Sequence, residues 1–182
     1  GYAFIYTSFL KRATPQNIVI GGLAGAMPPL LGWVSETNQM AAAPWLLVMI
    51  IFTWTPPHFW ALAIARKSDY ERAKIPMLPV THGVQYTGMQ IILYTVILII
   101  VSLLPFATRM SGWLYLLGAV VLGAGFMVRS LDLYRGKNPK APMETFRYSI
   151  IYLMALFLIM LLDHWLIAKI PSNVFITIGL PF

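Results

Sequence analysis

Five long apolar runs constrain what this chain can fold into more than any other feature of its sequence. A helix needs about 20 apolar residues to cross the hydrocarbon core of a bilayer. Each run has about this length and predicts a transmembrane helix, and a shorter run over residues 1–10 predicts part of another. The five predicted spans cover residues 14–34, 43–65, 88–107, 112–130 and 146–166. The chain is therefore predicted to be an all-α, polytopic transmembrane helix bundle, with residues 1–182 in a single membrane-embedded domain.

The composition agrees with a membrane protein and argues against a soluble domain. Of the 182 residues, 59% are hydrophobic and only 10% are charged, whereas soluble domains are about 45–50% apolar. A soluble core of this size cannot bury so many apolar side chains, and exposing them leads to aggregation. The sequence contains no cysteine, which excludes disulfides, Cys-based metal sites and Cys nucleophiles.

Charged residues lie mainly in the short segments between the runs, and the basic ones gather in alternate segments. Basic clusters at 11–12, 66–74 and 129–147 fall on one side, while segments on the other side carry single charges such as Glu36 and Arg109. Because cytoplasmic segments of membrane proteins are enriched in Lys and Arg, the basic segments are predicted to face the cytoplasm. The same bias explains the net charge of +7 without nucleic-acid binding.

One predicted cytoplasmic loop, residues 66–87, brings acidic and basic side chains together. Its acids are Asp69 and Glu71, two of only six in the chain. Mg²⁺ commonly binds one or two carboxylates and completes its shell with water and phosphate oxygens, and neighbouring bases bind the remaining phosphate oxygens. A metal–diphosphate site at this loop is one interpretation; the other is a solvated loop whose acids pair with adjacent bases. The bases are Arg66, Lys67, Arg72 and Lys74.

His58 is an ionisable residue within the predicted span 43–65. Such residues usually face the interior of a bundle and are candidates for function. If the helix continues into the loop, Asp69 lies within roughly 20° of His58 around the helix axis. Three roles are open to His58. It could ligate a metal, donate a proton, or form a hydrogen bond to a backbone carbonyl that Pro56 or Pro57 leaves without a donor.

Two further groups of residues are candidates for substrate binding. Asn17 opens a span shortly after Lys11 and Arg12, where the first helical turn can receive an anion; a simple helix cap is the alternative. Aromatic rings near the loop can shield an allylic cation, although ordinary packing also explains them. These rings belong to Trp54, Phe59, Trp60 and Tyr70.

Residues 6–33 and 55–80 closely resemble the haem O synthases, a branch of the UbiA-type family of intramembrane prenyltransferases. The second segment contains TPPHFW and, from Asp69, DYERAKIPM. The broader family has a DxxxD pattern here, whereas this chain has Ala73 four residues after Asp69, as the haem O synthases do. The resemblance implies a nine-helix bundle, of which this chain supplies the end of helix 4 and helices 5–9. The family's first acidic loop would lie upstream, so the chain alone is expected to be inactive.

The resemblance also implies a reaction, in which the farnesyl group of farnesyl diphosphate is transferred to the 2-vinyl group of haem B. Addition of water gives haem O for terminal oxidases. Mg²⁺ would act with the diphosphate, and the site would open on the cytoplasmic side of a bacterial cytoplasmic membrane. Haem A synthase or the oxidase assembly machinery would be partners.

The resemblance assigns roles to residues of this sequence. Catalytic roles fall to Asp69, Arg66, Lys67 and Tyr70, and metal binding to Asp69 and, with less support from the motif, Glu71. Substrate contacts fall to Lys11, Arg12, Asn17, Trp54, His58, Arg72 and Lys74. Among these, Lys11, Arg12 and the loop bases would meet the haem propionates, and His58 would ligate the iron or orient the porphyrin.

Three other functions fit parts of the sequence. The first is a prenyltransferase that acts on an aromatic acid of a quinone pathway, and the second is a non-catalytic, haem-handling membrane protein of oxidase assembly. The third is a small transporter, which is disfavoured because few polar residues other than Asn17 and His58 lie within the spans. Product analysis with haem B against 4-hydroxybenzoate separates the first from farnesyl transfer. A haem-binding spectrum without diphosphate release would favour the second.

Overall fold

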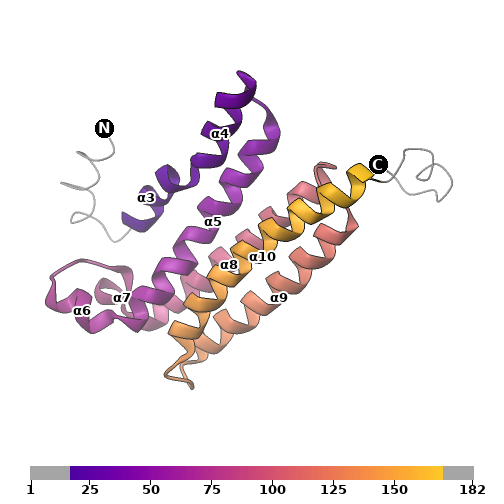
Figure 1. Cartoon of the computed structure of the whole chain (residues 1–182). Coiled ribbons are helices and arrows are strands. Elements are labelled where there is room, and N and C mark those ends of the chain that lie inside the picture. The colour runs from indigo at the N-terminus through magenta and orange to yellow at the C-terminus, as the bar shows by residue number, and fades with distance from the viewer. Residues whose placement is uncertain (1–16, 170–182) are drawn as a thin grey trace.

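The computed structural model describes residues 17–169, which form eight helices and no strand (Figure 1). The prediction of an all-α fold is confirmed. The first four helices are α3 (Asn17–Ala26), α4 (Pro28–Thr37), α5 (Ala42–Ala65) and α6 (Lys67–Arg72). The remaining helices are α7 (Leu78–Thr81), α8 (Gly83–Ala107), α9 (Trp113–Arg135) and α10 (Ala141–Lys169).

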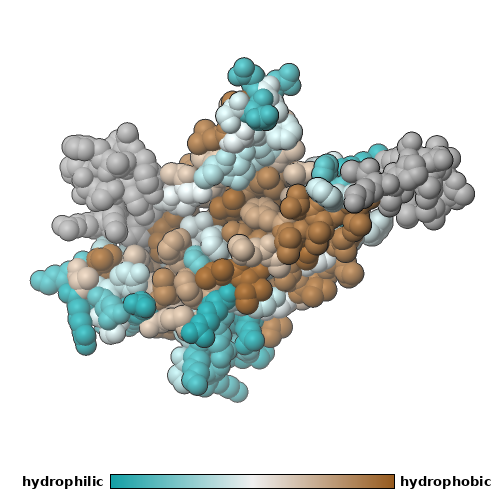
Figure 2. Space-filling view, in the orientation of Figure 1, coloured by the Kyte–Doolittle hydropathy of each residue, from teal (hydrophilic) through white to brown (hydrophobic). Residues whose placement is uncertain are grey.

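Four of these helices, α5, α8, α9 and α10, are long and apolar enough to cross a membrane. Between 22% and 33% of the most apolar stretch is buried in α8, α9 and α10, against 56% in α5. The outer three helices therefore expose apolar side chains such as Ile100, Leu117 and Leu158. Figure 2 shows a hydrophobic surface over α9 and α10. An apolar surface of this kind suits contact with lipid.

The predicted span over residues 14–34 is interrupted within the described residues, next to its proline pair. Instead of one helix, the structure has the ten-residue helices α3 and α4, separated at Met27. Pro28 and Pro29 lack a backbone N–H and occupy the start of α4, where the missing donors do no harm. Each short helix is only about 15 Å long, and the two follow one another along α5 (Figure 1).

Helix α5 lies at the centre of the described bundle and packs against α3, α4, α7, α8 and α10. The apolar residues of α5 lie on all sides of the helix, as expected for a helix without a water-facing surface. The second proline pair of the chain, Pro56 and Pro57, is buried inside α5, which continues through it without a break. The position of α5 places its side chains against both α3 and α10.

Close contacts and hydrogen bonds join the three outer helices. The Ser102 and Tyr152 hydroxyls are 2.7 Å apart, and the Tyr115 hydroxyl donates to the Ser102 carbonyl oxygen at 2.8 Å. Thr95 and Ser130 pair in the same way at 3.0 Å between α8 and α9. In an apolar environment such pairs satisfy polar groups that have no access to water. They hold α8, α9 and α10 in a fixed arrangement behind α5.

Candidate active site

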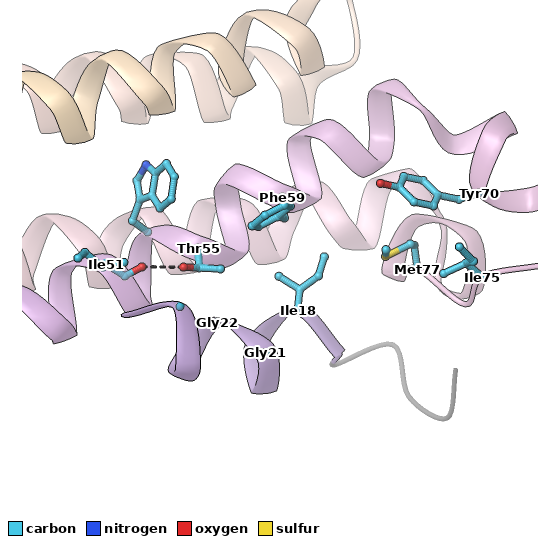
Figure 3. A pocket seen from close by; sticks show the side chains of 11 residues that line it. Ile18, Gly21, Gly22, Ile51, Thr55, Phe59, Tyr70, Ile75 and Met77 are labelled. Atoms are coloured by element: carbon cyan, nitrogen blue, oxygen red, sulfur yellow. Dashed lines mark hydrogen bonds between the residues drawn. The ribbon is translucent and has the colours of Figure 1, made fainter. Parts of the chain in front are cut away.

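A cavity of about 510 Å³ lies between α3 and α5 (Figure 3). Helix α3 contributes Gly21, Gly22 and Gly25, and α5 contributes the rings of Trp54 and Phe59. A Cβ atom added to Gly22 would lie 2.9 Å from Thr55 Cγ2, whereas one added to Gly25 would have no atom within 4 Å. Gly22 therefore permits close approach of the two helices, whereas Gly25 borders open space.

One end of the cavity is closed by the chain that follows α5. Tyr70 of α6 and then Ile75 and Met77 contribute to its lining (Figure 3). Backbone hydrogen bonds from Ile75 to Tyr70 and from Met77 to Ile75, at 3.1 and 2.8 Å, fold this segment back on itself. The apolar side chains thereby face the cavity, while the charged residues of α6 stay on the outside.

The membrane helix does not continue into the loop, which corrects the geometry expected for His58 and Asp69. The backbone of Arg66 has φ −114° and ψ 30°, which is not helical, and α6 begins at the next residue. The angular relation between the two side chains assumed one continuous helix. The turn at Arg66 removes it, and α6 instead lies beside α7 at the end of the bundle (Figure 1).

Asp69 and Glu71 do not converge on a common point. They are two positions apart in α6, which separates their side chains by about 200° around the helix. Glu71 Oε1 lies 3.4 Å from Lys67 Nζ in an exposed ion pair, as the solvated-loop interpretation expected. Asp69 is exposed, and its carboxylate has no hydrogen-bond or ion-pair partner among the side chains that the structure describes. The part of the chain that the structure describes holds no cluster of three acidic or histidine residues for a metal.

The bases of this segment surround α6 at its exposed surface. Arg66, Arg72 and Lys74 are exposed, and Lys67 is half-buried. Lys74 adopts a left-handed backbone conformation, with φ 53°, because the chain reverses direction immediately after α6. Asp69 thus lies in a strongly basic setting close to Tyr70, whose ring reaches the cavity.

His58 is buried on the side of α5 that faces α10. Its Nδ1 lies 2.6 Å from the Ser149 hydroxyl, so its partner is a side chain and not a carbonyl freed by the prolines. The imidazole stacks on Trp54 and on Phe146, with centroid separations of 4.2 and 4.6 Å. Trp54 Nε1 donates to the Ser149 carbonyl oxygen at 2.7 Å.

Ser149 and Phe146 of α10 were not among the residues singled out from the sequence. In the structure, His58 lies seven residues before the end of α5, and Ser149 lies eight residues after the start of α10. The predicted span 146–166 began five residues later than α10 and therefore did not show that the two residues lie at similar depth. Both of these helix ends adjoin predicted cytoplasmic loops. Polar residues at equal depth in two spans are candidates for an interhelical hydrogen bond.

The remaining predicted residues fall into two groups. Lys11 and Arg12 lie outside the described residues, and Asn17 begins α3 without a described side chain. Trp60, which was grouped with the loop aromatics, instead packs against Tyr94 of α8 at 5.3 Å. Its ring is 1% exposed in the core, so packing is the better explanation for this residue.

Comparison with known proteins connects these features to a family. The profile of the UbiA prenyltransferase family matches residues 1–161. "Protoheme IX farnesyltransferase 2" of Pseudoalteromonas translucida is 67% identical over 167 residues, which are 92% of this chain and 54% of the relative. "Protoheme IX farnesyltransferase" of Teredinibacter turnerae is 68% identical over 166 residues, 91% of this chain and 53% of the relative.

The chain spans about half the length of the curated relatives that it matches. The protein named "Protoheme IX farnesyltransferase" from Saccharophagus degradans shows the same relation, with 66% identity over 96% of this chain and 56% of the relative. No solved structure matches.

Proposed function

Because this chain belongs to the UbiA prenyltransferase family, we propose that the protein transfers the farnesyl group of farnesyl diphosphate to the 2-vinyl group of haem B. Addition of water then gives haem O. The observation that carries the proposal is the junction at Tyr70, where an apolar cavity meets a short, highly charged helix. Farnesyl diphosphate has the matching division into an apolar chain and an anionic end. The names of the relatives supply the identity of the acceptor.

The cavity between α3 and α5 accommodates the isoprenoid chain. Its walls combine glycine backbone with aromatic rings, and such an apolar lining limits the contact of a reactive carbon with water. The rings of Trp54, Phe59 and Tyr70 present π faces that stabilise the positive charge of an allylic cation. This stabilisation is greatest when the charge has formed, which is the requirement for catalysis.

The charged helix α6 binds the diphosphate. Asp69, whose carboxylate has no partner among the described side chains, is free to hold Mg²⁺ together with phosphate oxygens and a second acidic loop of the kind found in the family. Bound Mg²⁺ neutralises charge on the leaving diphosphate. Arg66, Lys67, Arg72 and Lys74 donate hydrogen bonds to the remaining oxygens. Glu71 does not fit as a second ligand on the same side of α6, because it points away from Asp69 and pairs with Lys67.

The remaining parts of the proposal concern the binding of haem B and the location of the protein in the cell. Lys11 and Arg12, which precede the described residues, meet the haem propionates together with Asn17. His58 lies beside the reacting vinyl group. The protein works in the bacterial cytoplasmic membrane with α6 on the cytoplasmic side, and haem A synthase or oxidase assembly receives the product.

The test compares Asp69→Asn with Glu71→Gln in a full-length protein that contains this chain. Haem B, farnesyl diphosphate and Mg²⁺ are supplied, and prenylated haem is measured by mass. We expect haem O from the unchanged protein, a loss of about 100-fold or more for Asp69→Asn, and a loss below about threefold for Glu71→Gln because its exposed ion pair contributes little.

Each other outcome assigns the protein differently. Product from 4-hydroxybenzoate but not from haem B would make it a quinone-pathway prenyltransferase. Bound haem without diphosphate release would favour the assembly protein. Haem O at equal rates from all three proteins would keep the reaction and move the diphosphate site away from α6.

A further inference from the structure

The hydrogen bonds around His58 determine which of its nitrogens carries the proton. The Ser149 hydroxyl lies 2.6 Å from His58 Nδ1 and also donates to the Phe146 carbonyl oxygen at 2.6 Å. A serine hydroxyl has one proton, and the carbonyl oxygen can only accept. Ser149 therefore accepts from His58, so that Nδ1 carries the proton and Nε2 holds a free lone pair.

The imidazole is also held in one orientation. Trp54 stacks on one face and Phe146 on the other, with interplanar angles of 19° and 27°, and Phe59 meets its edge at 5.0 Å. The Trp54 indole is itself fixed by its bond to the Ser149 carbonyl oxygen. Residues of α10 thus set both the tautomer and the direction of the ring.

The free nitrogen points away from α10. The two nitrogens of an imidazole are directed to opposite sides of the ring, so Nε2 faces away from Ser149. No hydrogen-bond partner for Nε2 occurs among the side chains that the structure describes, and the residue keeps 8% of its surface exposed. Trp54 and Phe59, which both contact the imidazole, also line the cavity. Nε2 is therefore a lone-pair acceptor at the border of the candidate active site.

We propose that His58 is the general base that takes a proton from the water added during haem O formation, with Ser149 as the residue that positions it. This inference rests on the proposed farnesyl transfer. The bond between the farnesyl carbon and the diphosphate oxygen breaks, and the electron pair leaves with diphosphate. The terminal vinyl carbon bonds to the farnesyl carbon, which leaves a cation on the vinyl carbon attached to the porphyrin. Water bonds to that carbon and passes one proton to Nε2.

The geometry favours a base over an iron ligand. A porphyrin that binds iron through Nε2 must lie across the end of the imidazole and needs open space wider than the ring. His58 is enclosed on both faces by Trp54 and Phe146 and is only 8% exposed. The proton transfer needs only one water molecule at Nε2, and general bases of this kind accelerate proton transfer by about 10²–10⁴-fold.

Three substitutions in the full-length protein test the proposal. His58→Asn keeps a side-chain N–H near the position of Nδ1 but has no Nε2. Ser149→Ala removes the acceptor that fixes the tautomer, and Ser149→Thr retains the hydroxyl. Haem B and farnesyl diphosphate are supplied, and diphosphate release, product mass and the absorption spectrum of bound haem are recorded.

We expect a change in the product and not only in its rate. Without a base, the cation loses a proton from the neighbouring carbon, which gives an alkene one water lighter than haem O. His58→Asn should lower hydroxylated product by about 100-fold while diphosphate release and the lighter product persist. Ser149→Ala should shift the ratio in the same direction by a smaller factor, and Ser149→Thr should restore most of the hydroxylated fraction.

The results that would overturn this inference differ from the result that would reject the proposed function. An unchanged ratio of hydroxylated to lighter product in both His58→Asn and Ser149→Ala would overturn the proposal. Loss of haem binding or an altered spectrum of bound haem in His58→Asn would make His58 a haem ligand and would also overturn it. No prenylated haem from the unchanged protein would instead reject the proposed function, and this inference would fall with it.

Discussion

The carboxylate of Asp163, near the C-terminal end of α10, accepts a hydrogen bond from the backbone N–H of Gly112, the residue that precedes α9. A second bond from the N–H of Tyr115 measures 3.4 Å. The first N–H groups of a helix have no partner within it, and here an acidic residue from another helix supplies one. Asp163 is 2% exposed, and its hydrogen bonds join the start of α9 to α10.

We expect Asp163→Ala to destabilise the protein by about 1–3 kcal/mol, because it leaves two backbone donors unpaired in a buried position. Asp163→Asn retains an acceptor oxygen and should lose less. Thermal unfolding of the purified protein in detergent measures both variants. Equal stability of Asp163→Ala and the unchanged protein would show that the helix start does not depend on this bond.

A second prediction concerns the packing of α9 on α10. A Cβ atom at Gly125 would collide with the Tyr148 hydroxyl, which donates to the Leu122 carbonyl oxygen at 3.0 Å. Gly125→Ala should therefore lower stability by about 1–3 kcal/mol. Gly32→Ala is the matched control, because a Cβ there meets no atom within 4 Å and alanine favours helix by up to about 1 kcal/mol.

The double variant Gly125→Ala/Tyr148→Phe gives a further check by the same unfolding measurement. It removes the hydroxyl that the new methyl group would meet, so part of the lost stability should return relative to Gly125→Ala alone. If Gly125→Ala and Gly32→Ala are equally stable, the close approach of the two helices at Gly125 is not a constraint.

A third prediction tests whether the cavity binds the isoprenoid. Gly25 lines the cavity, and a Cβ atom added there would meet no atom within 4 Å. Gly25→Leu should therefore fill part of the cavity volume without moving α5. We expect the KM for farnesyl diphosphate to rise about tenfold or more, since steric exclusion of this size corresponds to about 1–3 kcal/mol. Gly32→Leu, on α4 and away from the cavity lining, should leave KM unchanged. If KM rises equally in both variants, the cavity does not bind the isoprenoid chain.

Hydropathy alone located the long helices well. The predicted spans 43–65 and 88–107 correspond to α5 and α8, which end at the predicted residues, Ala65 and Ala107. Two proline pairs gave different outcomes, however. Pro28 and Pro29 begin a new helix, whereas Pro56 and Pro57 lie inside α5. Neighbouring helices pack around α5 on several sides and hold its course, and the dipeptide itself carries no information about such packing.

The candidate site was predicted less completely than the fold. The sequence drew attention to Asp69, Tyr70, Trp54 and His58 because charge and polarity are rare in this chain. It did not indicate Ser149, which is 91 residues from His58, since contacts between distant segments depend on how the helices rotate against one another. Nor did it indicate the turn at Arg66, which a run of residues with good helix propensity gave no reason to expect.

The helix break at Arg66 separates two sets of side chains that selection can act on independently. The glycines and rings of α3 and α5 shape the cavity, while the acid and bases of α6 belong to a helix with its own start and end. Substitutions among the glycines and rings of α3 and α5 leave the spacing of charges in α6 intact, and Tyr70 is the one cavity residue that belongs to α6. Substitutions in α3 and α5 can therefore reshape the cavity while the charged surface of α6 keeps its arrangement.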